Sequence, residues 1–170
     1  MFDSHELLDA FAYNYPIDSN RKLYKSYKGK TLLWLFFQNP GYFYQITKEL
    51  ESSNEFGVLR DKMKMILDYL NSLEVKRTCI NCDKQASHVT IIEQQVYGLN
   101  IISCDDDDCE KFIQKFIKGA SFEKVKLDLY SLILISDSLQ YQKILVRILK
   151  IGWKLPSRFN YMSYRDILLT

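Results

Sequence analysis

Four cysteines are the residues whose types and spacing most clearly specify chemistry in this chain. They lie within one 31-residue window as a Cys-x2-Cys pair, a 21-residue spacer and a Cys-x4-Cys pair, at Cys79, Cys82, Cys104 and Cys109. Structural zinc sites are usually tetrahedral and favour thiolate ligands, and two residues between cysteines let one tight turn present both sulfurs. The pattern therefore predicts one structural Zn²⁺ ion bound by all four side chains.

Other interpretations of the four cysteines are weaker. The N-terminal residues lack the basic-then-apolar pattern of a secretory signal, so we expect an intracellular, cytoplasmic protein. In a reducing compartment, paired cysteines more often bind metal than form disulfides. A redox Cys-x2-Cys motif normally lies in a βαβ context, which this sequence does not predict. Four unrelated cysteines would not be expected to gather in a single window.

The elements around the cysteines are expected to be a hairpin and a helix. Runs rich in β-branched residues at 88–92 and 99–102, with Gly98 near the turn, predict a β-hairpin. A helix is expected from Glu110 to Lys118, ended by Gly119. Cys109 would then lie at the mouth of this helix, where the positive helix end favours the thiolate.

The predicted order is a Cys-x2-Cys turn, then a hairpin, then a helix. This order resembles a treble-clef zinc finger. The resemblance covers Cys79–Lys118, about a quarter of the chain. The second pair of a treble clef is usually Cys-x2-Cys, whereas Cys104 and Cys109 are separated by four residues. The wider spacing implies either a zinc-ribbon-like variant or a helix that supplies only one ligand.

His88 and the acidic run 105–108 are candidates for parts of a catalytic site. HNH-type nucleases carry a catalytic histidine on the first hairpin strand of a treble clef, about where His88 falls. That family also has an acidic or histidine residue before the base and an Asn or His in the following helix, and neither is found here. The acidic run lacks the EF-hand pattern and suits ordinary helix capping. We expect no enzymatic activity.

A second resemblance lies near the N-terminus. Tyr27-Lys28-Gly29-Lys30-Thr31-Leu32, followed by Asn39-Pro40-Gly41-Tyr42-Phe43, is similar to a small module appended to exodeoxyribonuclease X-like proteins and their phage relatives. The resemblance implies a role in nucleic-acid metabolism without catalytic residues. Lys28 and Lys30 flank a glycine that would let backbone amides approach a phosphate, and Tyr27 and Tyr42 could stack on bases. The alternative is a basic surface turn that begins a helix.

Helices are expected in the rest of the N-terminal part. Asp3, Thr31 and Asn39-Pro40 are typical helix starts. Residues 54–73 show apolar side chains three and four apart, which predicts a helix packed on its own domain or, less favourably, a homodimer seam. These side chains are Phe56, Leu59, Met63, Ile66, Leu70 and Leu73.

The C-terminal part is ambiguous in one segment. Residues 121–136 fit both strand alternation and helical spacing, and we favour the helix. A further helix, capped by Asp137 or Ser138, is expected to reach about Lys150. The predicted fold is α+β and predominantly helical, with a zinc-bound hairpin in the middle of the chain. Its parts are a helical lobe (1–75), a zinc finger (76–119) and a basic helical lobe (120–170), together forming one compact unit.

Charge is unevenly distributed along the chain. The net charge is only +2, but residues 111–170 hold eleven Lys and Arg against four Asp and Glu. This asymmetry indicates an acidic partner, nucleic acid being the commonest, although basic side chains can also simply solvate helix faces. The candidate phosphate contacts are Lys28, Lys30, Lys111, Lys115, Lys118, Lys124, Lys126, Arg147, Lys150, Lys154 and Arg158.

These features together suggest a function. We expect a non-catalytic, zinc-binding accessory protein associated with nucleic acid or a nucleic-acid-processing protein, in a phage, mobile-element or defence context. The alternative is a protein–protein adaptor or inhibitor that uses its aromatic residues as interface anchors. No segment reaches the roughly 18 apolar residues of a membrane-spanning helix, so no membrane partner is expected.

Overall fold

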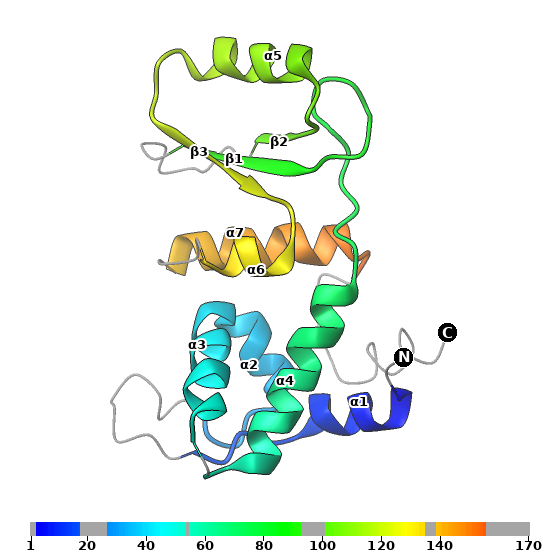
Figure 1. The fold of residues 1–170 in the computed structure, drawn as a ribbon, viewed down its shortest axis with the longest axis vertical. Helices are drawn as coiled ribbons and strands as arrows, with labels where there is room; N and C mark the ends of the chain where they lie inside the picture. Colours follow the sequence, from blue (N-terminus) through cyan, green and yellow to red (C-terminus); the bar gives the residue numbers. More distant parts are fainter. Residues whose placement is uncertain (1–2, 18–26, 54, 93–100, 135–138, 156–170) are drawn as a thin grey trace.

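The computed structural model describes residues 3–17, 27–53, 55–92, 101–134 and 139–155. Figure 1 shows an elongated molecule with α1–α4 at one end, α6 and α7 across the middle, and a small sheet with α5 at the other end. The α+β class is confirmed. The elements in chain order are α1 (Ser4–Ala12), α2 (Leu32–Gln38), α3 (Pro40–Glu51), α4 (Gly57–Ser72), β1 (His88–Ile92), β2 (Ile101–Ser103), α5 (Asp107–Ile117), β3 (Phe122–Lys126), α6 (Leu129–Leu134) and α7 (Leu139–Gly152).

Three helices begin where the sequence predicts. The Asp3 carboxylate accepts hydrogen bonds from the first backbone N–H groups of α1. Thr31 Oγ1 accepts from the Trp34 N–H at 3.2 Å at the start of α2. Asn39 Oδ1 accepts from the Tyr42 N–H at 3.0 Å, and Pro40 occupies the first position of α3. Each cap supplies a partner to a backbone donor that the helix itself leaves unpaired.

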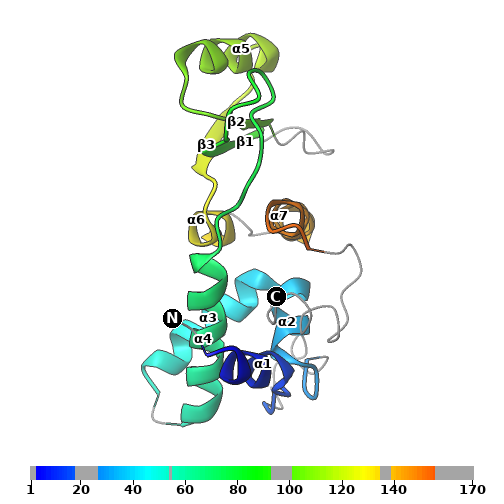
Figure 2. The same ribbon diagram turned by 90° about the vertical axis from the view of Figure 1, so that its right-hand side faces the viewer.

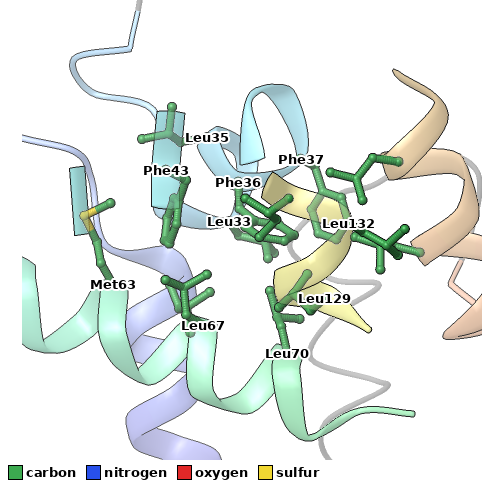
Figure 3. Close-up of a cluster of buried hydrophobic side chains, with 14 of the residues drawn as sticks. Leu33, Leu35, Phe36, Phe37, Phe43, Met63, Leu67, Leu70, Leu129 and Leu132 are labelled. Carbon is green, nitrogen blue, oxygen red and sulfur yellow. The ribbon is translucent and has the colours of Figure 1, made fainter. Parts of the chain in front are cut away.

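The helices at one end share a large apolar core. Figure 3 shows side chains from α2, α3, α4 and α6 meeting in it. On α4, Leu59, Met63, Ile66 and Leu70 are buried, and α4 packs against α1 and α3 of the same chain. Four of the six residues of the predicted apolar stripe are therefore covered within the chain, whereas Phe56 is exposed and Leu73 is half-buried. We call α1–α4 with α6 and α7 the helical lobe.

The sheet has three antiparallel strands in the order β2-β1-β3. Val89 of β1 pairs with Ile102 of β2 and with Val125 of β3, and these three side chains belong to the same core cluster as the helical lobe. The opposite face of the sheet packs on α5. Figures 1 and 2 show the sheet lying between α5 on one side and α6 and α7 on the other. We call residues 76–92 and 101–126 the cysteine lobe.

The helix predicted over residues 121–136 is wrong for its first part. Residues Phe122–Lys126 form β3, which pairs with β1 along its whole length. Val125 is buried while its neighbours are exposed, and the pairing with β1 makes this segment a strand. The helix starts later, at α6, where Asp128 Oδ1 accepts from the Ser131 N–H at 2.8 Å. The zinc-finger boundary expected at residue 119 thus precedes a strand that belongs to the cysteine lobe's sheet.

Some sequence predictions lie outside the described residues. These include the hairpin turn near Gly98, between β1 and β2, and the cap at Asp137 or Ser138 before α7. Within the described part of the chain, no helix has the length and apolar character needed to cross a bilayer.

Candidate metal centre

The four cysteine side chains converge at one end of the cysteine lobe. Their sulfur atoms all lie within 4.8 Å of one another, and none is in a disulfide. Ligand sulfurs about 2.3 Å from a tetrahedral zinc ion are roughly 3.8 Å apart, so the observed separations suit a single shared ion. Among the described residues, these four cysteines form the group of metal-binding side chains that lie close enough together to hold an ion. The predicted ligands are therefore brought together.

The first pair is presented by a tight turn. Thr78 and Gln85 form an isolated antiparallel bridge, and the Cys79 N–H donates to the Lys84 carbonyl at 2.8 Å. Asp83 has a φ of 57°, a left-handed conformation that Asp adopts more readily than most residues. The turn thereby reverses direction directly after Cys82, and both sulfurs project from one side of it.

The second pair comes from two different elements. Cys104 directly follows β2, whereas Cys109 is the third residue of α5. The prediction that the helix begins near Glu110 is wrong, because Asp106 caps it and α5 starts at Asp107. Of the two explanations offered for the wide Cys-x4-Cys spacing, the geometry fits a helix that supplies one ligand. The four intervening residues reverse the chain from the strand into the helix.

The electrostatics of the cluster favour a bound cation. Burial opposes ionisation of Cys79, but backbone N–H groups of Asn81, Cys104 and Cys82 donate to its sulfur and lower its pKa to about 6. Asn81 Nδ2 also donates to Cys109 Sγ at 3.4 Å, yet burial and the neighbouring sulfurs raise the pKa of Cys109 to about 12. Cys79 therefore ionises readily, whereas ionisation of Cys109 is unfavourable beside the other sulfurs. A divalent cation removes the repulsion between thiolates.

Asp106 ties the first cysteine turn to the helix that carries Cys109. Its carboxylate accepts from the Asp108 N–H at 3.1 Å and from Lys84 Nζ at 2.9 Å. The Lys84 ammonium is the main cause that holds the pKa of Asp106 below its usual value. This carboxylate therefore fixes the position of α5 relative to the turn that follows Cys82.

Asp105 forms a second set of polar contacts, which link the segment after Cys104 to the sheet. Ser87 Oγ donates to its carboxylate at 2.8 Å, and His88 Nδ1 lies 2.8 Å from the other oxygen. Lys124 Nζ of β3 lies 3.7 Å from Asp105 and 3.3 Å from Glu110. The hydrogen bond from Ser87 is the largest cause that lowers the pKa of Asp105. His88 thus contacts this carboxylate, and its imidazole is engaged away from the cysteine sulfurs.

The candidate phosphate contacts do not share one face. Lys111, Lys115 and Lys118 lie on or directly after α5, at one end of the molecule (Figure 1). Arg147 and Lys150 lie on α7 in the middle, and Lys154 follows this helix. Lys124 and Lys126 are on β3, and Arg158 lies outside the described residues. The lysines of α5 and the cations of α7 are therefore separate groups on different sides of the sheet.

In the N-terminal turn, the two tyrosines and the backbone donors near Gly29 have partners within the fold. Tyr27 and Tyr42 stack on each other with ring centroids 5.2 Å apart, and Tyr42 is buried. The Gly29 N–H donates to the Tyr15 carbonyl at 2.9 Å and the Lys30 N–H to the Tyr27 carbonyl at 3.0 Å. The backbone donors at the glycine are thus already used in this fold. Lys28 and Lys30 are exposed beside it.

One feature was missed by sequence reasoning. A cavity of about 340 Å³ lies between the C-terminal ends of α4 and α7, and Tyr69, Lys76, Trp153 and Lys154 are among the residues that line it. Trp153 Nε1 donates to the Leu73 carbonyl across 80 positions of sequence. No local pattern signals a site whose walls come from segments so far apart.

Comparisons with known proteins return nothing for this chain. No protein family matches it, and searches of curated proteins and of solved structures find no match.

Proposed function

We propose that this chain is a non-catalytic zinc-binding protein that acts as an accessory component on nucleic acid or in a nucleoprotein complex. The observation that carries the zinc assignment is the convergence of four thiols at separations that suit one tetrahedral ion. Zinc is the metal that four thiolates favour in a structural site, and a site closed by four protein ligands leaves no open position for chemistry. The ion would hold the fold of the cysteine lobe.

The element order around this centre supports a treble-clef-like finger. A cysteine turn precedes β1 and β2, which pair antiparallel, and α5 follows with one ligand in its first turn. We infer that β1 and β2 form the hairpin of such a finger. Ile80 N–H donates to the Ile102 carbonyl at 3.0 Å, so the first cysteine turn is fastened directly to β2.

The nucleic-acid part of the proposal rests on charge. Residues 139–155 contain Lys143, Arg147, Lys150 and Lys154 and no Asp or Glu. Arg147 and Lys154 are exposed, and neither forms an ion pair with a described residue. Cations without acidic partners favour a polyanion, because binding them releases counterions from the phosphate backbone.

Two measurements test this function. Elemental analysis of the purified protein should find one zinc per chain, and the Cys79→Ser/Cys109→Ser variant should lose it. Binding of labelled DNA and RNA, measured by fluorescence anisotropy, should weaken steeply as salt is added. Absence of stoichiometric zinc would overturn the first half of the proposal. Absence of nucleic-acid binding even at low salt would overturn the second half and leave the metal assignment intact.

A protein–protein adaptor is the second candidate, and one observation favours it. Phe112 and Phe116 lie one turn apart on α5 and keep 42% and 55% of their surface exposed. Exposed aromatic pairs on one helix face are typical anchors at protein interfaces. If Phe112→Ser/Phe116→Ser abolishes capture of a host protein while the wild-type protein binds no DNA or RNA, the adaptor function is supported.

A further inference from the structure

We propose that α7 and the cavity at its C-terminal end form a binding site for single-stranded nucleic acid. In this arrangement, phosphates contact a row of cations on α7 and one unpaired base enters the cavity against Trp153. The inference rests on the proposed function and deepens it, because it names the strand type and the surface.

The cations of α7 follow the period of the helix. Lys143, Arg147 and Lys150 are four and three residues apart, so their side chains lie in one row with a cation about every 4.5–6 Å along the axis. Lys143 and Arg147 are exposed, and neither is paired with an acid in the described part of the chain. Lys150 lies over the Phe37 ring, 5.6 Å from its centroid, so its stem is held at the surface of the helical lobe.

The opposite side of α7 faces the core. Leu145, Ile148 and Leu149 are buried in the same cluster as the helices beneath. Figure 2 shows α7 nearly end-on, with α6 beside it and α2 and α3 below. Since the apolar face is turned inward, the cationic row is turned outward, where an extended chain of phosphates can reach it.

The cavity continues this row. Lys154 follows α7 by two residues and lines the cavity, as does Lys76 from the segment after α4. The acidic residue in the wall, Glu74, lies 3.9 Å from Lys76. The walls therefore combine two cations, one paired carboxylate and the apolar and aromatic side chains of Leu70, Trp153 and Leu155. Its volume of about 340 Å³ falls within the range of small-ligand sites.

Specific contacts between the ends of α4 and α7 shape the cavity. A side chain at Gly152 would meet Val75 Cγ1 at 2.4 Å, so only glycine lets the end of α7 approach the segment after α4 this closely. The Lys76 N–H donates to the Gly152 carbonyl at 3.2 Å. The hydrogen bond from Trp153 Nε1 to the Leu73 carbonyl holds the indole in a set orientation in the wall. A fixed aromatic ring beside cations is what base stacking next to phosphate binding requires.

These features select a single strand over a duplex. An unpaired base can leave its neighbours and stack on an aromatic ring at little cost, whereas a paired base must first be unstacked and flipped out. The cationic row alone would bind either form. The cavity at its end is therefore the feature expected to discriminate between them.

The experiment uses the full-length zinc-loaded protein and short oligothymidylate as the probe. The chain has two tryptophans, so Trp34→Phe leaves Trp153 as the sole reporter. We expect titration with oligothymidylate to quench Trp153 fluorescence. We expect a blunt DNA duplex of equal length to bind less tightly and to cause no quenching.

Substitutions then test whether the oligonucleotide binds to α7 and the cavity. Trp153→Leu, which keeps an apolar side chain, and Lys154→Glu should each weaken oligothymidylate binding roughly tenfold. Arg147→Glu should weaken it and reduce the salt dependence. Lys64→Glu, the same charge inversion at an exposed site on α4, should have little effect. Circular dichroism checks that each variant is folded, and Lys154→Glu carries the test if Trp153→Leu is not.

The outcomes separate the inference from the function beneath it. If the protein binds oligothymidylate but binding depends on Lys115 and Lys118 of α5 and not on Arg147 or Lys154, the inference fails and the proposed function stands. Tighter binding of the duplex, or binding without quenching of Trp153, also overturns the inference. If neither probe binds at low salt, the proposed nucleic-acid function fails with it.

Discussion

The helical lobe and the cysteine lobe are each stabilised in a different way. The helical lobe buries large side chains, among them Phe11, Phe36 and Phe43, in a core that its helices build together with one face of the sheet. On its α5 side, the cysteine lobe has a cluster of only four isoleucines, Ile92, Ile101, Ile113 and Ile117, next to the cysteines. Small modules that cannot bury enough apolar surface usually depend on a metal or on disulfides. The comparison predicts that a bound metal would supplement a small core in the cysteine lobe, whereas the helical lobe would not need one.

Removing the metal is expected to have the largest effect, and to affect the cysteine lobe selectively. Free energies of structural zinc binding, about 10–16 kcal/mol in zinc-finger peptides, are free energies of folding. After chelation, or in Cys79→Ser, hydrogen exchange read by mass spectrometry should lose protection over β1, β2, α5 and β3. Protection in α1–α4 should remain, and added zinc should restore the cysteine lobe of the wild-type protein. Equal loss of protection in α1–α4 would show that the lobes unfold together and would contradict the comparison.

A substitution in the core of the helical lobe is expected to destabilise that lobe without affecting the metal centre. Phe43 is fully buried and packs edge-on against Phe36 with ring centroids 5.6 Å apart. We expect Phe43→Ala to lower the free energy of unfolding by about 3–5 kcal/mol, because it removes buried apolar surface and leaves a cavity. Urea unfolding followed by tryptophan fluorescence measures this change. Zinc content should be unchanged, and loss of the metal in this variant would indicate that the helical lobe supports the metal centre.

A smaller effect is expected at a helix cap in the helical lobe. Asn39 accepts from the Tyr42 N–H and donates to the Tyr27 hydroxyl at 3.3 Å. Asn39→Ala should cost about 1 kcal/mol in the free energy of unfolding, since an N-terminal backbone donor loses its partner. Gln38→Ala, at an exposed neighbouring position, is the matched control. Equal unfolding midpoints for the two variants would rule out the cap as a source of stability.

The smallest expected effect lies in the cysteine lobe and depends on pH. The pKa of Asp105 is lowered in the folded state, so its carboxylate stabilises the fold above its unfolded pKa of about 3.9. This contribution is lost as the pH falls through the lower folded value. Asp105→Asn should cost less than about 1 kcal/mol at neutral pH, because the carboxylate is 64% exposed. The difference from wild type should shrink below about pH 4.

Asp107→Asn controls for this change, because the Asp107 side chain is exposed and forms no hydrogen bond or ion pair with a described residue. Acid release of the metal affects wild type and variants alike, since all keep the four cysteines. A difference for Asp105→Asn that stayed constant from neutral to acid pH would show that its charge is not the cause.

Local features of the chain were determined by the sequence alone. The caps at Asp3, Thr31 and Asn39 and the tight turn that carries Cys79 and Cys82 were predictable, because a cap or a Cys-x2-Cys turn is decided by residues a few positions apart. The start of α5 was missed because Asp106, rather than a residue next to Glu110, supplies the cap.

Only the tertiary structure decided which distant segments meet. Residues 122–126 became a strand because β1 offers an unpaired edge, a condition that no local pattern records. The cations of α5 and α7 are separated by the sheet (Figure 1), and the cavity beside Trp153 lies where Gly152 lets the end of α7 approach Val75 closely. Local propensities are weak compared with the free energy of packing and pairing between segments, so long-range contacts settled each of these features.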